Sequence, residues 1–226
     1  MAWFILVLAI IVSYCVGSIN GAVVISTAHG GNDVRKEGSG NAGMTNMIRS
    51  RGIGPGLATF LIDTFKGTVV CLIAKLWVLP YVYEALPYEM LHPEYTVYYC
   101  AIACIIGHVY PVWFGFKGGK GVSTTLGIGL VCNWQTALIA LGLFIVLFVI
   151  TRIVSVGSIV AAISLPILNF FFATPVRDSN YKLIQVLLIT IMALNILISH
   201  RANIGRLIRG EEKKLQPKKK EPKNEQ

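Results

Sequence analysis

Three segments of this chain combine glycines with hydroxyl, amide and cationic side chains, at 37–52, 116–125 and 199–210. They read EGSGNAGMTNMIRSRG, FKGGKGVSTT and SHRANIGRLIRG. Glycine lets backbone N–H groups approach an anion closely, and lysine and arginine supply the opposite charge. These residue types in this pattern point to the binding of phosphate groups.

The first segment alternates glycines with small polar residues, namely Gly38, Gly40 and Gly43 with Ser39, Asn41, Thr45 and Asn46. An apolar pattern follows, which predicts a helix that starts here. Free backbone amides at a helix N-terminus, together with hydroxyl and amide side chains, form a phosphate site. The alternative is a flexible loop made of ordinary turn residues.

The second segment invites comparison with the nucleotide-binding P-loop, which requires Gly, four residues and then Gly-Lys-Ser/Thr. Here Gly121 follows Lys120, and Phe114 occupies the position of the first glycine. The segment also follows an apolar run instead of a strand, so it is not a P-loop. Lys117 and Lys120 could simply mark the cytoplasmic side of a membrane, but that alternative leaves the glycines unexplained.

One ionisable pair lies inside an apolar run. Asp63 and Lys66 are three residues apart, so on a helix they share a face and can pair. Such groups usually face a polar interior and mark function, although a lysine that snorkels toward the interface is an equal alternative. For His108 we expect a packed, hydrogen-bonded side chain. The histidines are isolated, so neither a metal nor another cofactor is expected.

The composition is that of a multi-span membrane protein. Hydrophobic residues make up 54% of the 226 residues and charged residues 14%, with a mean hydropathy of +0.65, whereas soluble domains carry about 25% charged residues. Nearly half of the 20 Lys and Arg residues lie from Arg201 onward. A basic tail after an apolar span favours contact with anionic membrane lipid, and nucleic-acid binding is not expected.

Six segments are apolar and long enough to cross a bilayer: 3–24, 55–79, 95–115, 134–150, 153–173 and 181–199. The loops 28–54 and 116–121 are basic, while 80–94 carries acidic residues without Lys or Arg. The positive-inside rule therefore places the N-terminus outside. A short seventh crossing at 118–132 is needed to bring the basic tail back to the cytoplasm.

The sequence thus predicts an all-α integral membrane protein, a seven-transmembrane-helix bundle with its N-terminus outside and its C-terminus cytoplasmic. We expect residues 1–210 to form a single transmembrane catalytic domain and 211–226 to form a basic disordered cytoplasmic tail. The N-terminal segment lacks the features of a cleaved signal peptide and is expected to be a retained span.

Three motifs in register resemble those of a known family. GSGNAGMTN at 38–46, GHVYPVWFGFKGGKGVST at 107–124 and HRANIGRLIRG at 200–210 are similar to the signature motifs of the bacterial acyl-phosphate:glycerol-3-phosphate acyltransferases of the PlsY type. The family's DxxKG falls at 63–67 and an R-x-x-S-x-x-S pattern at 152–158. Ala202 stands where the family often has Glu. The resemblance implies a seven-span bundle in the bacterial cytoplasmic (inner) membrane, with its motifs on the cytoplasmic face.

The implied reaction transfers a fatty acyl group from acyl phosphate to the sn-1 hydroxyl of glycerol 3-phosphate. It yields lysophosphatidic acid and phosphate, the first step of phospholipid synthesis. Membrane lipid surrounds the protein, and a soluble enzyme that supplies acyl phosphate is a candidate partner. A membrane transporter of an organic phosphate is the rival function, since phosphate-binding loops and polar residues inside a bundle would suit a carrier.

The resemblance also implies roles for individual residues. Ser39, Lys120 and His200 are the expected catalytic groups. The expected substrate-binding residues are Gly40, Asn41, Thr45, Asn46, Arg49, Lys117, Gly118, Gly119, Gly121, Ser123, Thr124 and Asn203. Whether His200 or a substrate phosphate oxygen takes the hydroxyl proton is left open by the sequence.

Overall fold

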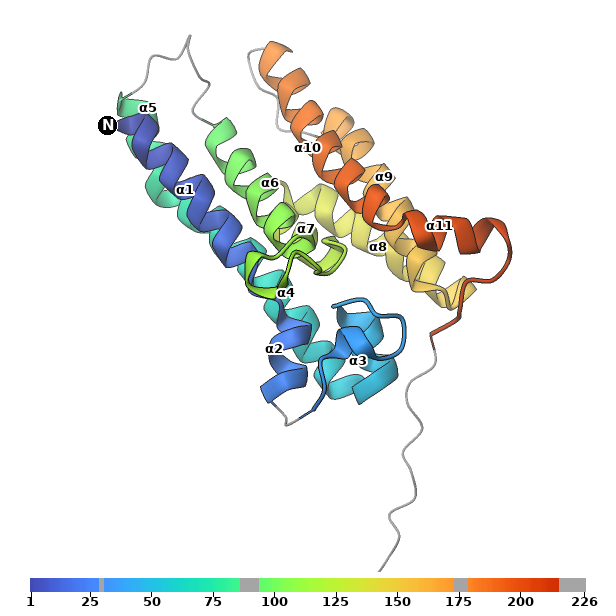
Figure 1. Ribbon diagram of the computed structural model, residues 1–226. Coiled ribbons are helices and arrows are strands. Elements are labelled where there is room, and N and C mark those ends of the chain that lie inside the picture. Colours follow the sequence, from blue (N-terminus) through green and yellow to red (C-terminus); the bar gives the residue numbers. More distant parts are fainter. Residues whose placement is uncertain (29–30, 86–93, 173–178, 216–226) are drawn as a thin grey trace, which may run out of the picture.

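The computed structural model describes residues 1–28, 31–85, 94–172 and 179–215 (Figure 1). Within these ranges every regular element is a helix, which confirms the all-α prediction there. The α-helices are α1 (Ala2–Gly17), α2 (Gly21–Ala28), α3 (Met44–Arg51), α4 (Ile53–Ile73), α5 (Leu79–Ala85), α6 (Tyr95–Val109), α7 (Val122–Cys132), α8 (Trp134–Thr151), α9 (Val154–Phe172), α10 (Ser179–Ser199) and α11 (Arg201–Ile208). A π-helical stretch, Ala74–Val78, joins α4 to α5.

Five stretches are long and apolar enough to cross a membrane: 53–85, 95–114, 134–151, 154–172 and 181–199. The pair α1 and α2, bent by 44°, makes a sixth if it counts as one span. Each of the six long segments expected from hydropathy therefore contains helix. The eleven residues of α7 are apolar but short, so the seventh crossing stays a prediction, as does the orientation of the termini.

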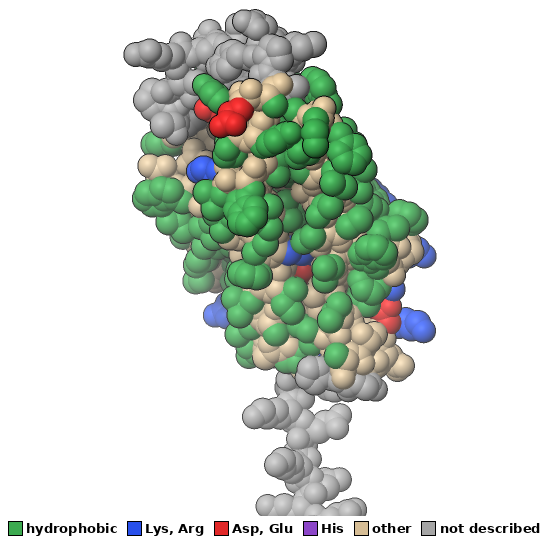
Figure 2. Space-filling model, turned by 90° about the vertical axis from the view of Figure 1, so that its left-hand side faces the viewer, with side chains coloured by type: hydrophobic (Ala, Val, Ile, Leu, Met, Phe, Trp, Pro, Cys, Tyr) green, Lys and Arg blue, Asp and Glu red, His purple; other side chains and the backbone are tan. Residues whose placement is uncertain are grey.

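The outer surface agrees with a membrane environment. Figure 2 shows hydrophobic side chains over most of the face it presents, with few charged groups in its middle. Large apolar side chains such as Phe4, Phe65, Trp77 and Ile150 are exposed. A soluble monomer seldom exposes apolar area on this scale, because water disfavours it. The described helices therefore form a multi-pass membrane protein.

The helices fall into two groups, with α1, α4 and α6 in one and α8, α9 and α10 in the other, and α7 packs against both α4 and α8 (Figure 1). Glycines allow the closest contacts. A methyl group on Gly67 would overlap the backbone of Thr124, and one on Gly127 would overlap that of Thr64. Small residues that let helix backbones touch are the usual basis of packing in membranes.

A buried ionic cluster closes the break between α1 and α2. Lys66 Nζ donates to the backbone oxygens of Gly17 (3.0 Å) and Ile19 (2.7 Å). It also lies 3.0 Å from Asp63 Oδ1 and 2.9 Å from His108 Nδ1. These contacts satisfy backbone groups that a broken helix would leave unpaired. The snorkelling alternative for Lys66 is wrong, since the side chain points inward and is buried, and the packed, hydrogen-bonded state of His108 is confirmed.

The first residues of the expected tail contact the bundle. Leu215 N donates to Arg152 O (2.8 Å), and Arg49 Nη2 donates to Lys213 O (3.0 Å). The boundary expected at 210 therefore does not separate the bundle from a free tail. The reason is a pairing of Glu212 with Arg206 at 2.6 Å, which turns the chain back after α11. The rest of the expected tail, 216–226, lies outside the described residues.

Candidate active site

A cavity of about 810 Å³ lies where α3, α7, α8, α9 and α11 meet. It has a polar end and an apolar arm. Eleven of the residues expected from the sequence line it: Ser39, Gly40, Asn41, Thr45, Asn46, Arg49, Lys120, Gly121, Ser123, His200 and Asn203. Residues from all three motif segments, up to 168 positions apart in the chain (38 to 206), thus reach one site.

Two expected ligand glycines are not part of the lining. Gly118 N donates to Val109 O (3.0 Å) and Gly119 N donates to His108 O (3.1 Å). Both amides are therefore used to fasten the loop to the end of α6. A methyl group on Gly119 would overlap the His108 ring, so glycine is required here for packing. This corrects their expected role as amide donors to substrate.

Lys117 and Thr124 also lie outside the lining. Thr124 is completely buried where α7 touches α4. Lys117 takes part through its backbone oxygen, which accepts a hydrogen bond from Arg35 Nη1 at 2.8 Å. Thr124 is buried and Lys117 is exposed, and neither side chain is among those that line the cavity.

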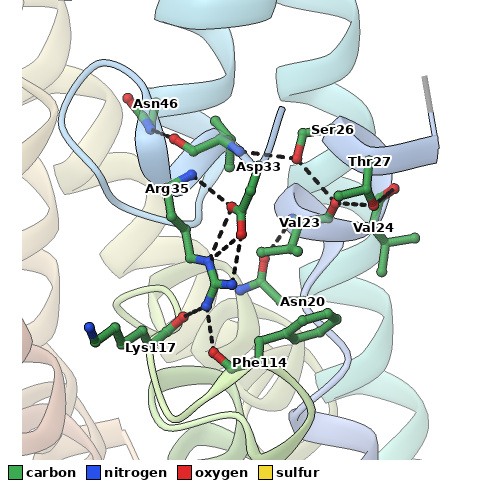
Figure 3. A network of polar contacts seen from close by, with 11 residues as sticks. Asn20, Val23, Val24, Ser26, Thr27, Asp33, Arg35, Asn46, Phe114 and Lys117 are labelled. Atoms are coloured by element: carbon green, nitrogen blue, oxygen red, sulfur yellow. Dashed lines mark hydrogen bonds and ion pairs between the residues drawn. The ribbon is translucent and has the colours of Figure 1, made fainter. Parts of the chain in front are cut away.

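Arg35 joins the first loop to the second, as Figure 3 shows. Its Nη1 donates to Phe114 O (2.5 Å) and Lys117 O (2.8 Å), while its Nε and Nη2 bind the Asp33 carboxylate at 2.7–3.1 Å. This pairing and the backbone donation from Arg35 N lower the pKa of Asp33. The guanidinium therefore bridges segments about 80 residues apart. Its five N–H donors allow one side chain to make all these bonds.

Asn46 lines the cavity, yet its amide is used inside the first loop. Its Nδ2 donates to Val34 O (2.9 Å) and Glu37 O (3.0 Å), and its Oδ1 accepts from Ser39 N (2.8 Å). The same loop has positive φ at Gly38 and Gly40, which favours glycine. Asn46 therefore shapes the loop that presents Ser39, instead of offering a free amide to a ligand.

Lys120 provides the central cation of the polar end. Its Nζ donates to Asn203 Oδ1 at 2.5 Å. Burial lowers the pKa of Lys120 to about 8, the nearby Arg206 and Arg49 lower it as well, and Glu212 opposes the shift. The ammonium is thus charged at neutral pH but incompletely compensated, so an anionic ligand beside it would be strongly favoured.

His200 is buried at the start of α11, with Nδ1 2.8 Å from Ile196 O. A backbone oxygen can only accept, so Nδ1 carries the proton and Nε2 keeps its lone pair. Burial lowers the pKa of His200 to about 4, helped by the Lys120 charge. The imidazole is therefore neutral at pH 7 and available as a hydrogen-bond acceptor.

Glu212 and Arg206 also line the cavity, although neither was among the site residues expected from the sequence. Glu212 Oε1 accepts from Asn203 Nδ2 (2.5 Å) and Ser155 Oγ (2.9 Å), and Oε2 accepts from Arg206 Nε (2.6 Å). For Arg206 a signal existed, since it follows Asn203 by three residues and shares its helical face. For Glu212 there was none, because its position depends on the return of the chain after α11.

The apolar arm runs between α8 and α9. It is lined by Ala137, Ala140, Leu141, Phe144 and Phe148 of α8 and by Ala161, Ala162 and Leu165 of α9, with Phe60 and Leu126 opposite. Ser155 and Ser158 of α9 lie where the arm meets the polar end. Within the described ranges no three His, Cys, Asp or Glu side chains converge as a metal site would require.

The chain is similar to known proteins over most of its length. The family model described as glycerol-3-phosphate acyltransferase matches residues 7–210. A glycerol-3-phosphate acyltransferase from Mesorhizobium japonicum is 38% identical over 93% of this chain and 96% of its own, and one from Thermosynechococcus vestitus is 37% identical over 93% and 95%.

Two solved structures are similar throughout. One is the glycerol 3-phosphate form of PlsY (YgiH), an integral membrane glycerol 3-phosphate acyltransferase, with a TM-score of 0.78 and 33% identity over 95% of this chain and 96% of that one. The other is its lysophosphatidic acid form, with a TM-score of 0.75 and 32% identity over 94% of each chain. The chain belongs to the glycerol-3-phosphate acyltransferase family of the PlsY type.

Proposed function

We propose that this protein transfers a fatty acyl group from acyl phosphate to the sn-1 hydroxyl of glycerol 3-phosphate, giving lysophosphatidic acid and phosphate. The observation that carries the proposal is a single cavity in which a cationic polar end continues into an apolar arm. Two phosphate-bearing substrates need the first feature and a fatty chain needs the second. The similar solved structures support the acceptor and the product of this reaction, since they are the glycerol 3-phosphate and lysophosphatidic acid forms of an acyltransferase.

In this proposal the first loop holds the acyl-phosphate headgroup. Ser39 and Thr45 offer hydroxyl donors, Asn41 offers an amide, and Gly40 lets the backbone come close. Lys120 lies across the cavity and neutralises the charge that grows on the departing phosphate. An acyl phosphate is already activated, so alignment and charge stabilisation account for the catalysis without a covalent nucleophile.

The acyl acceptor, glycerol 3-phosphate, binds on the side of Lys120 away from the first loop. Arg49 supplies a guanidinium for the phosphate of glycerol 3-phosphate, and Asn203 and His200 orient its glycerol part. The sn-1 oxygen forms a bond to the acyl carbon, the bond from that carbon to the phosphate oxygen breaks, and inorganic phosphate leaves. The hydroxyl proton must pass to a base in the same step.

The pKa of His200 bears on which base that is. At about 4, it lies below the second pKa of a phosphate monoester, about 6. A phosphate oxygen is therefore the stronger base and takes the sn-1 proton, while His200 Nε2 accepts a hydrogen bond from the neighbouring sn-2 hydroxyl and so orients the glycerol part. This assigns the proton to a substrate phosphate and a positioning role to His200.

The topology proposal follows from the helices and the loop charges. Counting α1 with α2, α4 with α5, then α6, α7, α8, α9 and α10 gives seven crossings, with the N-terminus outside and the C-terminus cytoplasmic. The active site would then face the cytoplasm of a bacterial cell from its inner membrane, where a soluble enzyme could deliver acyl phosphate. The catalytic unit is one domain, which we extend from 210 to 215 because Glu212 lines the cavity.

The test uses purified full-length protein in detergent with labelled glycerol 3-phosphate and one of three donors: acyl phosphate, acyl-CoA or acyl carrier protein. We expect lysophosphatidate with acyl phosphate alone. The rival carrier function predicts the opposite pattern, namely uptake of labelled glycerol 3-phosphate into sealed proteoliposomes without any acylation. Folded protein that forms no product with any donor would disprove the acyltransferase proposal.

A further inference from the structure

The apolar arm of the cavity ends at a buried polar cluster. Its lining stops at Ala137 on α8 and Leu165 on α9. Directly beyond, Asn169 Nδ2 donates to Thr136 Oγ1 (3.2 Å) and to Leu165 O (2.9 Å). Asn133 Nδ2 donates to Asn169 Oδ1 (3.2 Å). Thr136 and Asn169 are 1% and 3% exposed, and Asn133 is half-buried.

Helix α7 contacts α8 at the same end of the arm. A methyl group built on Gly129 of α7 would lie 2.9 Å from the Ala137 methyl group, so α7 and α8 touch here. Asn133 also caps α8, since its Oδ1 accepts from Thr136 N at 3.3 Å. The same residues therefore start α8 and join α8 to α9, next to the last residues that line the arm.

We propose that the cluster of Asn133, Thr136 and Asn169 is a floor that limits the length of the fatty acyl chain the enzyme accepts. The inference rests on the proposed function, because it assigns the arm to the acyl chain. A terminal methyl group that pushed past Leu165 would have to separate these amides and leave them unpaired in an apolar site. That penalty is larger than the gain from burying one more methylene.

The size of the effect follows from the geometry. Ala140 lies three residues above Ala137, or about 4.5 Å along α8. An extended hydrocarbon chain advances about 1.25 Å per carbon, given carbon–carbon bonds of about 1.5 Å and angles near 111°. A bulky side chain at position 140 should thus shorten the accepted chain by about three to four carbons.

The experiment offers full-length protein an equimolar mixture of acyl phosphates from C10 to C18, and mass spectrometry reads the lysophosphatidate products. Ala140→Phe should shift the profile toward shorter chains, with the ratio of C12 to C16 product rising about tenfold or more. Leu165→Ala should shift it toward longer chains. Ile139→Phe is the matched control, because Ile139 is 40% exposed on the outer face of the same helix, whereas Ala140 is 5% exposed.

The outcomes separate the possible failures. Shifts of opposite sign in Ala140→Phe and Leu165→Ala, with none in Ile139→Phe, support the floor. An unchanged profile in both variants overturns it. A loss that is equal for every chain length also overturns it, because a limit on chain length must reduce the longer products first. Wild-type protein that makes no lysophosphatidate from any donor overturns the proposed function, and the floor with it.

Discussion

The two ends of the cavity are built in different ways. The polar end is assembled from loops, and directional hydrogen bonds between distant residues hold it, such as those from Arg35 to Phe114 O and from Lys120 to Asn203. The apolar arm is formed by two adjacent helices, where Gly157 lets α9 lie against Phe144 of α8. Single substitutions at the polar end should therefore cause large losses of activity, because a hydrogen bond depends strongly on geometry. Substitutions in the arm should cause small, graded losses, because an apolar contact depends on volume.

The largest effect is expected from Lys120→Ala. Removing the cation that faces the departing phosphate should lower kcat by about 10²- to 10³-fold, as the loss of a preorganised charge-stabilising group does in other enzymes. Lys117→Ala is the matched control, because Lys117 contributes only its backbone oxygen to the described contacts and should keep near-normal activity. Steady-state kinetics with acyl phosphate compare the two, and equal losses would contradict the difference between these lysines.

The second largest loss of activity is expected from Arg35→Ala. Without the guanidinium the two loops lose their shared anchor, and a displacement of about 1 Å at the reacting groups can lower the rate by about 10²-fold. Arg35→Lys should recover only part of the activity, because an ammonium cannot make the same set of bonds. Arg209→Ala is the control, since Arg209 is exposed and pairs with Glu211. Wild-type kinetics in Arg35→Ala would show that the polar end does not depend on this bridge.

The effect of pH on kcat/KM should be smaller than the effects of these two substitutions, and it should reflect the protonation of Lys120. Because the pKa of Lys120 is lowered to about 8, the ammonium is present below pH 8 and is lost as the pH rises through that value. We expect kcat/KM to fall about tenfold per pH unit well above 8. Lys120→Arg should abolish this fall, since arginine stays protonated. A decline that persists in Lys120→Arg would assign it to another group.

The smallest effect is expected in the arm. Phe148→Leu removes part of one wall and should reduce kcat/KM for long-chain donors by roughly fivefold, equivalent to about 1 kcal/mol of apolar contact. Val149→Ala is the control, because Val149 is the exposed neighbour of Phe148, and it should leave kcat/KM unchanged. A loss in Phe148→Leu as large as that in Lys120→Ala would remove the contrast between the two ends.

Features that depend on local patterns could be predicted from the sequence. Long apolar runs predicted the helices because the bilayer leaves few other ways to satisfy backbone groups. Glycines beside hydroxyl and cationic residues predicted phosphate chemistry, and eleven of the fifteen expected site residues line the cavity. The motifs pointed to the family because their residue types are read directly from the chain.

The contacts that individual residues make became clear from the folded chain. Gly118 and Gly119 resemble ligand-binding glycines in sequence, yet their amides bind the end of α6. The sequence suggests that the Asn46 amide is free to bind a ligand, but in the folded chain it is hydrogen-bonded within the first loop. Glu212 reaches the site because Arg206 and Asn203 attract its carboxylate. In each case the outcome depends on partners far away in the chain, and a local pattern contains no information on which distant group will satisfy a given donor or acceptor.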